Sequence, residues 1–231
     1  SVWNDFISGK GVKWAFVFGN HDSTGYADKT RLCKLLGDFS GCLFRQGPTN
    51  LADGRYDYML GNYQILLADA DGQTLFSLIF MEGKKGDGRH ATFTDSQVAW
   101  YEWLVNGTNA DAGKTVKSMA FFHIPLPQYA LAADAAGRDS VEGLEESIYV
   151  GKRDSGLFDS MKRLGSTVAT FCGHDHENTF ALDYEGLKLC YGGSAGYTTH
   201  GRAKFKCVRI VELDVFEERF TTEIFFEKEL D

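Results

Sequence analysis

Three polar strings in the sequence carry histidine beside other side chains that can bind a metal ion. Each follows an apolar run: Gly19-Asn20-His21-Asp22 follows residues 12–18, His123 follows residues 116–122, and Gly173-His174-Asp175-His176 follows residues 167–172. Imidazole nitrogens with amide or carboxylate oxygens suit Zn, Fe, Mn or Co, and a ligand set without cysteine argues against a closed structural zinc site. In a tight Gly-His-x-His loop each histidine can reach a different ion of a pair, and two such ions clamp the oxygens of a phosphoryl group.

The apolar runs before these strings predict three buried strands, over residues 12–18, 116–122 and 167–172. Side chains just outside the carboxyl ends of neighbouring strands converge, because the strands are fixed side by side while their loops face one crevice. Glycine tolerates the backbone angles of sharp turns, and Gly19 and Gly173 stand where such turns are needed. We therefore expect the three strings to meet at one edge of a sheet.

The rest of the chain alternates strand and helix patterns, which predicts a mixed α/β (α+β) domain. Two hairpins are expected around the turn signals Asp71-Gly72 and Glu185-Gly186. The strands expected besides the three above lie over residues 63–68, 75–80, 180–183, 187–191, 207–213 and 220–226.

A helix is predicted over residues 27–36, with three leucines (Leu32, Leu35 and Leu36) on one face. A second helix is predicted after the capping pair Thr94 and Gln97. Its two tryptophans, Trp100 and Trp103, share a stripe, so we expect both indoles in the core.

The region between the second and third polar strings is predicted to be irregular at first. Pro125 and Pro127 are expected to stop regular structure. The acidic, small-residue-rich stretch 130–151 is expected to run over the surface as a long loop. A third helix is predicted to begin near Ser155.

The composition indicates one folded domain covering residues 1–231. The net charge is −8, and the 24 Lys and Arg residues are scattered singly or in pairs. No cationic stripe is therefore available to follow a nucleic-acid backbone, and no apolar run is long enough to predict a membrane span. We expect a small phosphorylated substrate or a phosphoprotein as partner, and no nucleic acid. Secreted, vacuolar and cytoplasmic locations all stay open.

The five cysteines contain no C-x-x-C pair and are odd in number, which argues against a disulfide framework and leaves one or two bridges open. Cys172 ends a predicted strand, and we interpret it as a small buried hydrophobe and not as a nucleophile. His90 and His200 stand alone and are interpreted as structural, although the Gly/Thr-rich loop of His200 could line the pocket.

The three polar strings resemble the third, fourth and fifth motifs of the calcineurin-like metallophosphoesterases. Three longer strings are similar to the short purple-acid-phosphatase-like branch of plants and fungi: His123-Ile124-Pro125-Leu126-Pro127-Gln128-Tyr129, Phe171-Cys172-Gly173-His174-Asp175-His176-Glu177-Asn178 and Leu189-Cys190-Tyr191-Gly192-Gly193. The similarity covers most of the chain, roughly from Trp14 to Leu213.

The resemblance implies a two-sheet β-sandwich flanked by helices, with two transition-metal ions (Fe, Zn or Mn) in the complete protein. It implies that Asn20, His123 and His174 bind one ion and that His176 binds the other. His21 would lie beside the phosphate without binding metal, and would stabilise charge or protonate the leaving alkoxide. The implied reaction is hydrolysis of a phosphomonoester by metal-activated hydroxide attacking phosphorus in line.

The sequence departs from the family pattern before its first polar string. The family's first two motifs, Asp-x-His and Gly-Asp, supply the bridging aspartate and most ligands of the second ion, and the 18 residues before Gly19 contain neither. We therefore expect an N-terminally truncated domain that lacks its first strands and binds one metal ion or none. Met81-Glu82-Gly83 and Gln128 also depart from the family pattern, which bears on substrate preference.

Two other functions stay open. The same motifs serve phosphodiesterases and nucleases, which a basic cluster near the site would favour, and no such cluster is evident in the sequence. A non-catalytic phosphoesterase-like module is the alternative from a different class of function.

Overall fold

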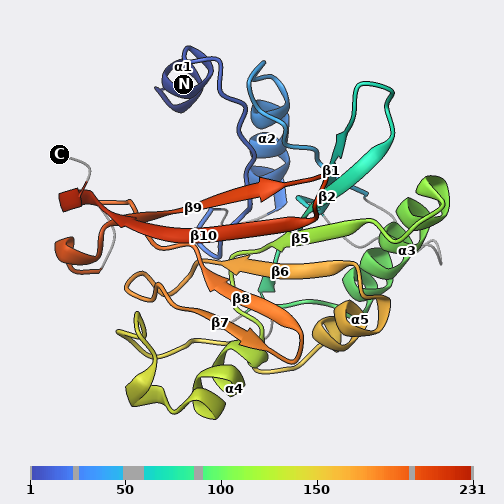
Figure 1. Cartoon of the computed structure of the whole chain (residues 1–231). Coiled ribbons are helices and arrows are strands. Elements are labelled where there is room, and N and C mark those ends of the chain that lie inside the picture. The colour runs from blue at the N-terminus through green and yellow to red at the C-terminus, as the bar shows by residue number, and fades with distance from the viewer. Residues whose placement is uncertain (1, 23–25, 49–59, 86–90, 198–200, 230–231) are drawn as a thin grey trace.

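The computed structural model of the chain describes residues 2–22, 26–48, 60–85, 91–197 and 201–229. Within these ranges, a six-stranded sheet with the strand order β1-β2-β5-β6-β8-β7 forms the centre of the fold (Figure 1). Its strands are β1 (Tyr63–Ala68), β2 (Thr74–Phe80), β5 (Lys117–Phe121), β6 (Thr167–Cys172), β7 (Ala181–Tyr184) and β8 (Leu187–Tyr191). The four inner strands are parallel, so the carboxyl ends of β2, β5, β6 and β8 lie at one edge.

Both faces of this sheet are covered. One face packs against three helices through a core that includes Tyr101, Tyr129 and Phe158. The opposite face packs against an antiparallel strand pair, with Phe171 of β6 in the same cluster as Val211 of the pair (Figure 1). The covering elements are α3 (Asp95–Ala112), α4 (Pro127–Ala136), α5 (Leu157–Leu164), β9 (Cys207–Asp214) and β10 (Arg219–Phe226). The predicted fold class, a large and a small sheet flanked by helices, is confirmed.

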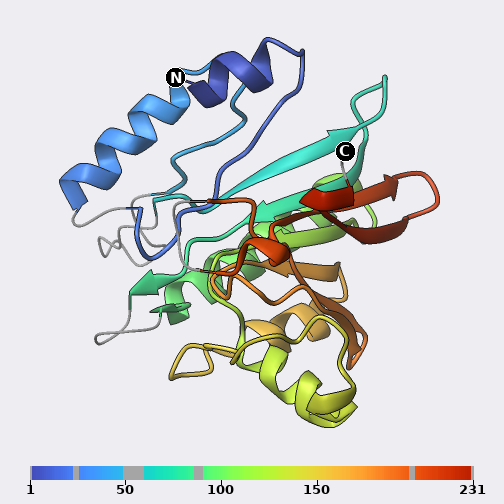
Figure 2. The ribbon, with the colours of Figure 1, turned by 90° about the vertical axis from the view of Figure 1, so that its left-hand side faces the viewer.

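The N-terminal part packs beside the β1–β2 hairpin. Figure 2 shows α1 (Val2–Ser8) and α2 (Tyr26–Gly37) together on one side of the molecule, away from α4. A separate aromatic cluster, which includes Phe18, Phe44 and Tyr63, joins this part to the large sheet. The remaining short elements are β3 (Lys84–Lys85), β4 (Ala91–Thr92), η1 (Arg138–Ser140), η2 (Ala203–Phe205) and η3 (Glu227–Glu229).

Local sequence signals account for most element boundaries. The Thr94 hydroxyl accepts from the Gln97 N–H and the Gln97 side chain accepts from the Thr94 N–H, so the predicted capping box begins α3. Glu185 and Gly186 join β7 to β8 with φ angles of 47° and 90°. Two successive positive φ angles are what a two-residue hairpin turn needs, and Glu-Gly is a pair that can adopt them.

The predicted strand over residues 12–18 is wrong as a regular strand. The segment is extended, but among the described residues its strand pairing is limited to an isolated bridge between Trp14 and Cys42. At Phe16 the backbone N–H donates to the Tyr63 hydroxyl (3.1 Å), and the same hydroxyl donates to the Phe16 carbonyl (2.8 Å). A side chain thus takes both hydrogen bonds that a neighbouring strand would otherwise make.

The surface loop predicted from residue 130 onward is also corrected, because α4 occupies Pro127–Ala136. Pro127 begins this helix instead of stopping regular structure. Proline is favoured in the first helical turn, where its missing N–H would have no intrahelical partner. The helix buries Tyr129, Ala132 and Ala133, so its small residues allow close packing against the sheet.

Two side-chain placements differ from the predictions. Trp103 is 69% exposed and lies outside the core, whereas Trp100 packs against it. In α2, Leu35 is exposed and Cys33 is buried in its place beside Leu36. Helical spacing identifies the apolar positions, but the neighbouring elements decide which of them are covered.

All five cysteines are free and buried. Burial raises the pKa of Cys172 well above its ordinary range, in agreement with its interpretation as a buried hydrophobe. No helix in the described part of the chain is both long and apolar enough to cross a membrane.

Candidate functional site

The parallel pair β5 and β6 places His123 and His174 side by side. The backbone pairing of these strands continues beyond their ends, because Gly173 N–H donates to the His123 carbonyl at 3.0 Å. His123 Nε2 lies 3.4 Å from His174 Nδ1, and the two rings are 5.2 Å apart and nearly perpendicular. The two histidines therefore lie together at the carboxyl edge of the large sheet.

Asn20 reaches the same place from the N-terminal segment. Its Oδ1 lies 2.8 Å from His123 Nε2. A Cβ on Gly19 would lie 3.1 Å from the same nitrogen, so glycine lets the chain pass this close to the imidazole. Asp22 Oδ2 accepts from the Gly19 N–H at 2.5 Å, which closes the turn that presents Asn20. Asp22 therefore orients the loop through this contact.

The loop after β6 is held in an unusual conformation. His174 has a φ of 75°, in the left-handed region that residues other than glycine seldom adopt. The buried Asp175 carboxylate supports the loop by accepting hydrogen bonds from the Tyr191 hydroxyl and from the Tyr149 N–H (3.1 Å). Burial raises the pKa of Asp175 to about 6, against the opposing effect of these hydrogen bonds. Strain at a conformation that the surroundings enforce is common at functional sites.

The histidines influence one another electrostatically. Burial, followed by the nearby imidazoles of His174, His176 and His21, lowers the pKa of His123 to about 4. A neutral imidazole keeps a lone pair that can bind a metal ion. The same interactions show that His176 and His21 lie close enough to His123 to affect its charge.

The fit of this cluster to a metal ion can be tested from its donor spacing. In a tetrahedral site with metal–ligand distances of about 2.1 Å, two ligand atoms lie about 3.4 Å apart. The distance from His123 Nε2 to His174 Nδ1 (3.4 Å) has this value, whereas the distance to Asn20 Oδ1 (2.8 Å) is shorter and is that of a hydrogen bond. Across the described ranges, no group of three or more His, Cys, Asp or Glu side chains is arranged to hold an ion. The trio fits one ion through an amide oxygen as its third donor.

Two further charged residues lie near this edge: Lys206, which the sequence analysis missed, and Glu82, which it named only as a departure from the family pattern. Glu82 follows β2 and is buried, with its carboxylate paired to Lys29 of α2. Lys206 is also buried, and Gly201 lies beside both its ammonium and His176. The available signal for Lys206 was the string Arg202-Ala203-Lys204-Phe205-Lys206, whose alternating cations form a basic cluster that the sequence analysis overlooked. His90 and His200 lie outside the described residues.

Comparisons with known proteins give a consistent family. The sequence profile of the calcineurin-like phosphoesterases matches residues 1–178. Probable inactive purple acid phosphatase 14 of Arabidopsis thaliana is 28% identical over 221 residues, which cover 87% of this chain and 54% of that protein. Phosphatase DCR2 of Saccharomyces cerevisiae is 28% identical over 227 residues, which cover 91% of this chain and 39% of that protein.

The chain spans about half the length of the plant relatives it matches. Among solved structures, a dimetal phosphatase from Danio rerio aligns with a TM-score of 0.40 and 11% identity, over 72% of this chain and 55% of that chain.

Proposed function

Because the chain belongs to the calcineurin-like phosphoesterase family, as its motifs predicted, we propose that it carries the site of a metal-dependent phosphoesterase that hydrolyses a phosphomonoester. The observation that carries this proposal is the meeting of Asn20 Oδ1, His123 Nε2 and His174 Nδ1, from three segments far apart in the sequence. Polar loops that touch by chance would not be expected to bring three candidate metal-binding atoms together.

The proposed roles follow from position and chemistry. Asn20, His123 and His174 would hold one ion, and His176, two residues after His174, would bind a second ion in the complete protein. When bound, such ions polarise phosphoryl oxygens and supply a nucleophile at neutral pH. Fe, Zn and Mn all suit this donor set.

His21 is proposed as the catalytic imidazole that does not bind metal. Its side chain is exposed, and it follows Asn20 directly, so it stands beside the donor cluster and open to a ligand. An imidazole there would protonate the leaving alkoxide or stabilise negative charge on the phosphoryl group. The substrate class that fits these roles is a small phosphorylated molecule or a phosphoprotein.

The proposal is tested by metal analysis together with hydrolysis of an aryl phosphate. The full-length protein is reconstituted with Mn²⁺, Zn²⁺ or Fe²⁺, and metal content and rate are measured for wild type, His123→Ala and His21→Ala. We expect His123→Ala to lose both metal and rate, and His21→Ala to keep the metal and lose rate by about 10²-fold or more. Loss of metal in His21→Ala would contradict its assigned role, and hydrolysis unchanged in His123→Ala would remove the proposed site.

A second candidate function is a non-catalytic module that binds phosphorylated ligands. Three plant relatives favour it, because each is called a probable inactive purple acid phosphatase. The same experiment separates the two, because a binding module would take up metal and inorganic phosphate without turning over the aryl phosphate.

A further inference from the structure

Lys206 is a buried cation at the same edge of the fold as the donor cluster. Only 4% of its surface is exposed. Its backbone forms a parallel bridge with Ser194, in the loop that follows β8, and its carbonyl accepts from Glu227 N–H at 2.8 Å. The residue is therefore fixed beside the carboxyl end of a strand that neighbours β6.

The Lys206 ammonium is close to His176. A Cβ on Gly201 would lie 3.6 Å from Lys206 Nζ, 3.2 Å from His176 Cβ and 3.9 Å from His176 Nδ1. Gly201 has a φ of 110° and no side chain, so nothing of its own fills the space that borders both the ammonium and the imidazole. Any ligand that reaches His176 is thus near this positive charge.

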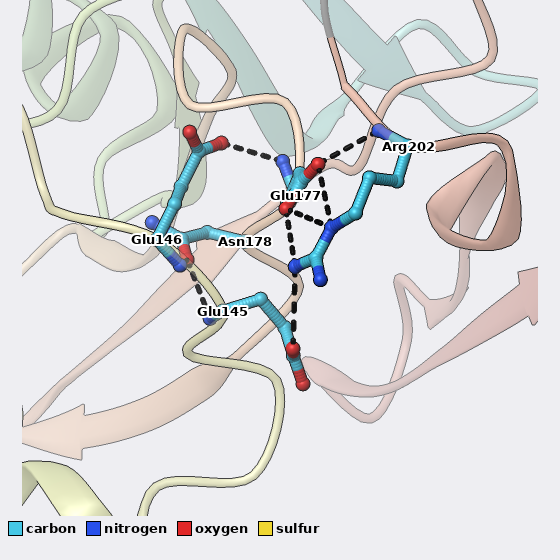
Figure 3. A network of polar contacts seen from close by, with 5 residues as sticks. All are labelled: Glu145, Glu146, Glu177, Asn178 and Arg202. Carbon is cyan, nitrogen blue, oxygen red and sulfur yellow. Dashed lines mark hydrogen bonds and ion pairs between the residues drawn. The ribbon is translucent and has the colours of Figure 1, made fainter.

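Two acidic residues near this loop, Glu145 and Glu177, are paired with a different cation, Arg202. Figure 3 shows the Arg202 guanidinium against the Glu177 carboxylate, with Glu145 on its other side. Arg202 Nη2 lies 2.6 Å from Glu177 Oε2 and 3.9 Å from Glu145 Oε2. Glu146 Oε1 accepts a hydrogen bond from the Glu177 N–H at 2.6 Å, so Glu146 also stabilises the loop that carries His176.

These contacts leave the Lys206 ammonium without a counter-charge in the described part of the chain, where no carboxylate forms an ion pair with it. The stem of Lys206 is buried, while its ammonium keeps contact with solvent, where an anion can reach it. Lys204, two residues earlier, is in a different position: it is exposed and lies over the Phe205 ring at 4.5 Å. The two lysines of one short segment therefore face different surroundings.

We propose that Lys206 forms an anion-binding subsite beside His176, in which its ammonium binds the phosphoryl oxygens of a phosphate monoester. The ammonium supplies up to three hydrogen-bond donors and one positive charge, which match a phosphoryl dianion. Gly201 keeps the path between the ammonium and His176 open. This inference rests on the proposed function, because it assigns the residue that recognises the substrate's phosphoryl group.

The test is calorimetric titration with inorganic phosphate of wild type, Lys206→Met, Lys206→Arg and the matched control Lys204→Met. Metal content is measured in parallel, and each titration is repeated with and without added Mn²⁺. We expect Lys206→Met to keep its metal and to bind phosphate roughly 10- to 100-fold more weakly, the loss typical of a charge-assisted hydrogen bond. Lys206→Arg should keep most of the affinity, and Lys204→Met should stay within about twofold of wild type.

Equal phosphate affinity of wild type and Lys206→Met would overturn the subsite, and so would a loss of metal in Lys206→Met, since the lysine would then support the fold of the loop. If Lys206→Met does not fold, Lys206→Gln takes its place, and failure of both neutral variants to fold would show a structural role and overturn the proposal. Failure of the proposed function looks different: wild type would bind no metal or hydrolyse no aryl phosphate, while the two lysine variants still differed in phosphate affinity.

Discussion

Two regions of the molecule supply the candidate ligands, and the fold holds them in different ways. His123 and His174 follow β5 and β6, whose backbone pairing continues through the Gly173 N–H to the His123 carbonyl. Asn20 and His21 follow residues 12–18, which are joined to the rest of the fold by the Trp14–Cys42 bridge and by a tyrosine hydroxyl. The first region is held by the hydrogen bonds of a β-sheet, and the second by a few isolated contacts.

This difference indicates where binding of the proposed metal ion would be coupled to folding. Segments with few backbone hydrogen bonds open at a lower free-energy cost than central strands. A ligand that binds only the ordered form stabilises it by mass action. We therefore expect a bound ion to order the Asn20 segment more than the strand-anchored histidines.

The largest effect is expected from removing the donor that touches both regions. His123→Ala should lower Mn²⁺ or Zn²⁺ affinity at least about 100-fold, because His123 Nε2 contacts both Asn20 and His174. Asn20→Ala should lower the affinity about tenfold, since water can replace a less firmly held amide oxygen. Competition with a chromophoric chelator measures both, with Asn106→Ala on the exposed face of α3 as the asparagine control. Equal losses would show that the two regions hold the ion equally well.

A smaller effect is expected from the two aspartates that support the ligand loops. Asp175→Ala should lower the free energy of unfolding by about 1–3 kcal/mol, because the Tyr191 hydroxyl and the Tyr149 N–H lose a buried partner. Asp22→Ala should cost less, because Asp22 is exposed and water can replace its bond to Gly19. Urea denaturation at pH 7 gives both values, and the reverse order would show that the N-terminal turn is the more firmly built of the two.

The smallest effect is expected from deleting one hydroxyl in each region. Tyr129→Phe removes bonds to Thr170 and to the Cys190 carbonyl that join β6 to β8, so global stability should fall by about 0.5–1.5 kcal/mol. Tyr63→Phe frees both backbone groups of Phe16, so amide exchange over residues 12–18 should quicken roughly two- to tenfold. Hydrogen exchange with mass spectrometry compares the two. A global loss from Tyr63→Phe as large as that from Tyr129→Phe would contradict the separation into two regions.

Much of the fold could be predicted because its signals are local. The capping box of α3, the Glu185-Gly186 turn and the apolar runs of β5 and β6 each lie within a few neighbouring residues. Backbone and side-chain preferences act over that range, so periodicity identifies the element. The family match shows that the polar strings at these strand ends carried equally specific information.

Other features were not predictable because their partners are distant in the sequence. Residues 12–18 have the composition of a buried strand, yet whether they join a ladder depends on what lies beside them, and at Phe16 that neighbour is Tyr63. Trp103 has the size of a core residue, but its side chain is 69% exposed, and none of the described elements covers its face of α3. Pattern alone does not specify such neighbours.

The sequence by itself determined the family, the types of the candidate ligands and the strands that present His123 and His174, because short strings of residues specify all of these. Only the tertiary structure decided that Asn20 Oδ1 comes within 2.8 Å of His123 Nε2 and that the buried Lys206 lies next to Gly201, near His176. The physical reason is that these contacts join segments separated by tens of residues, and their distances are set by how the whole sheet and its covering layers pack.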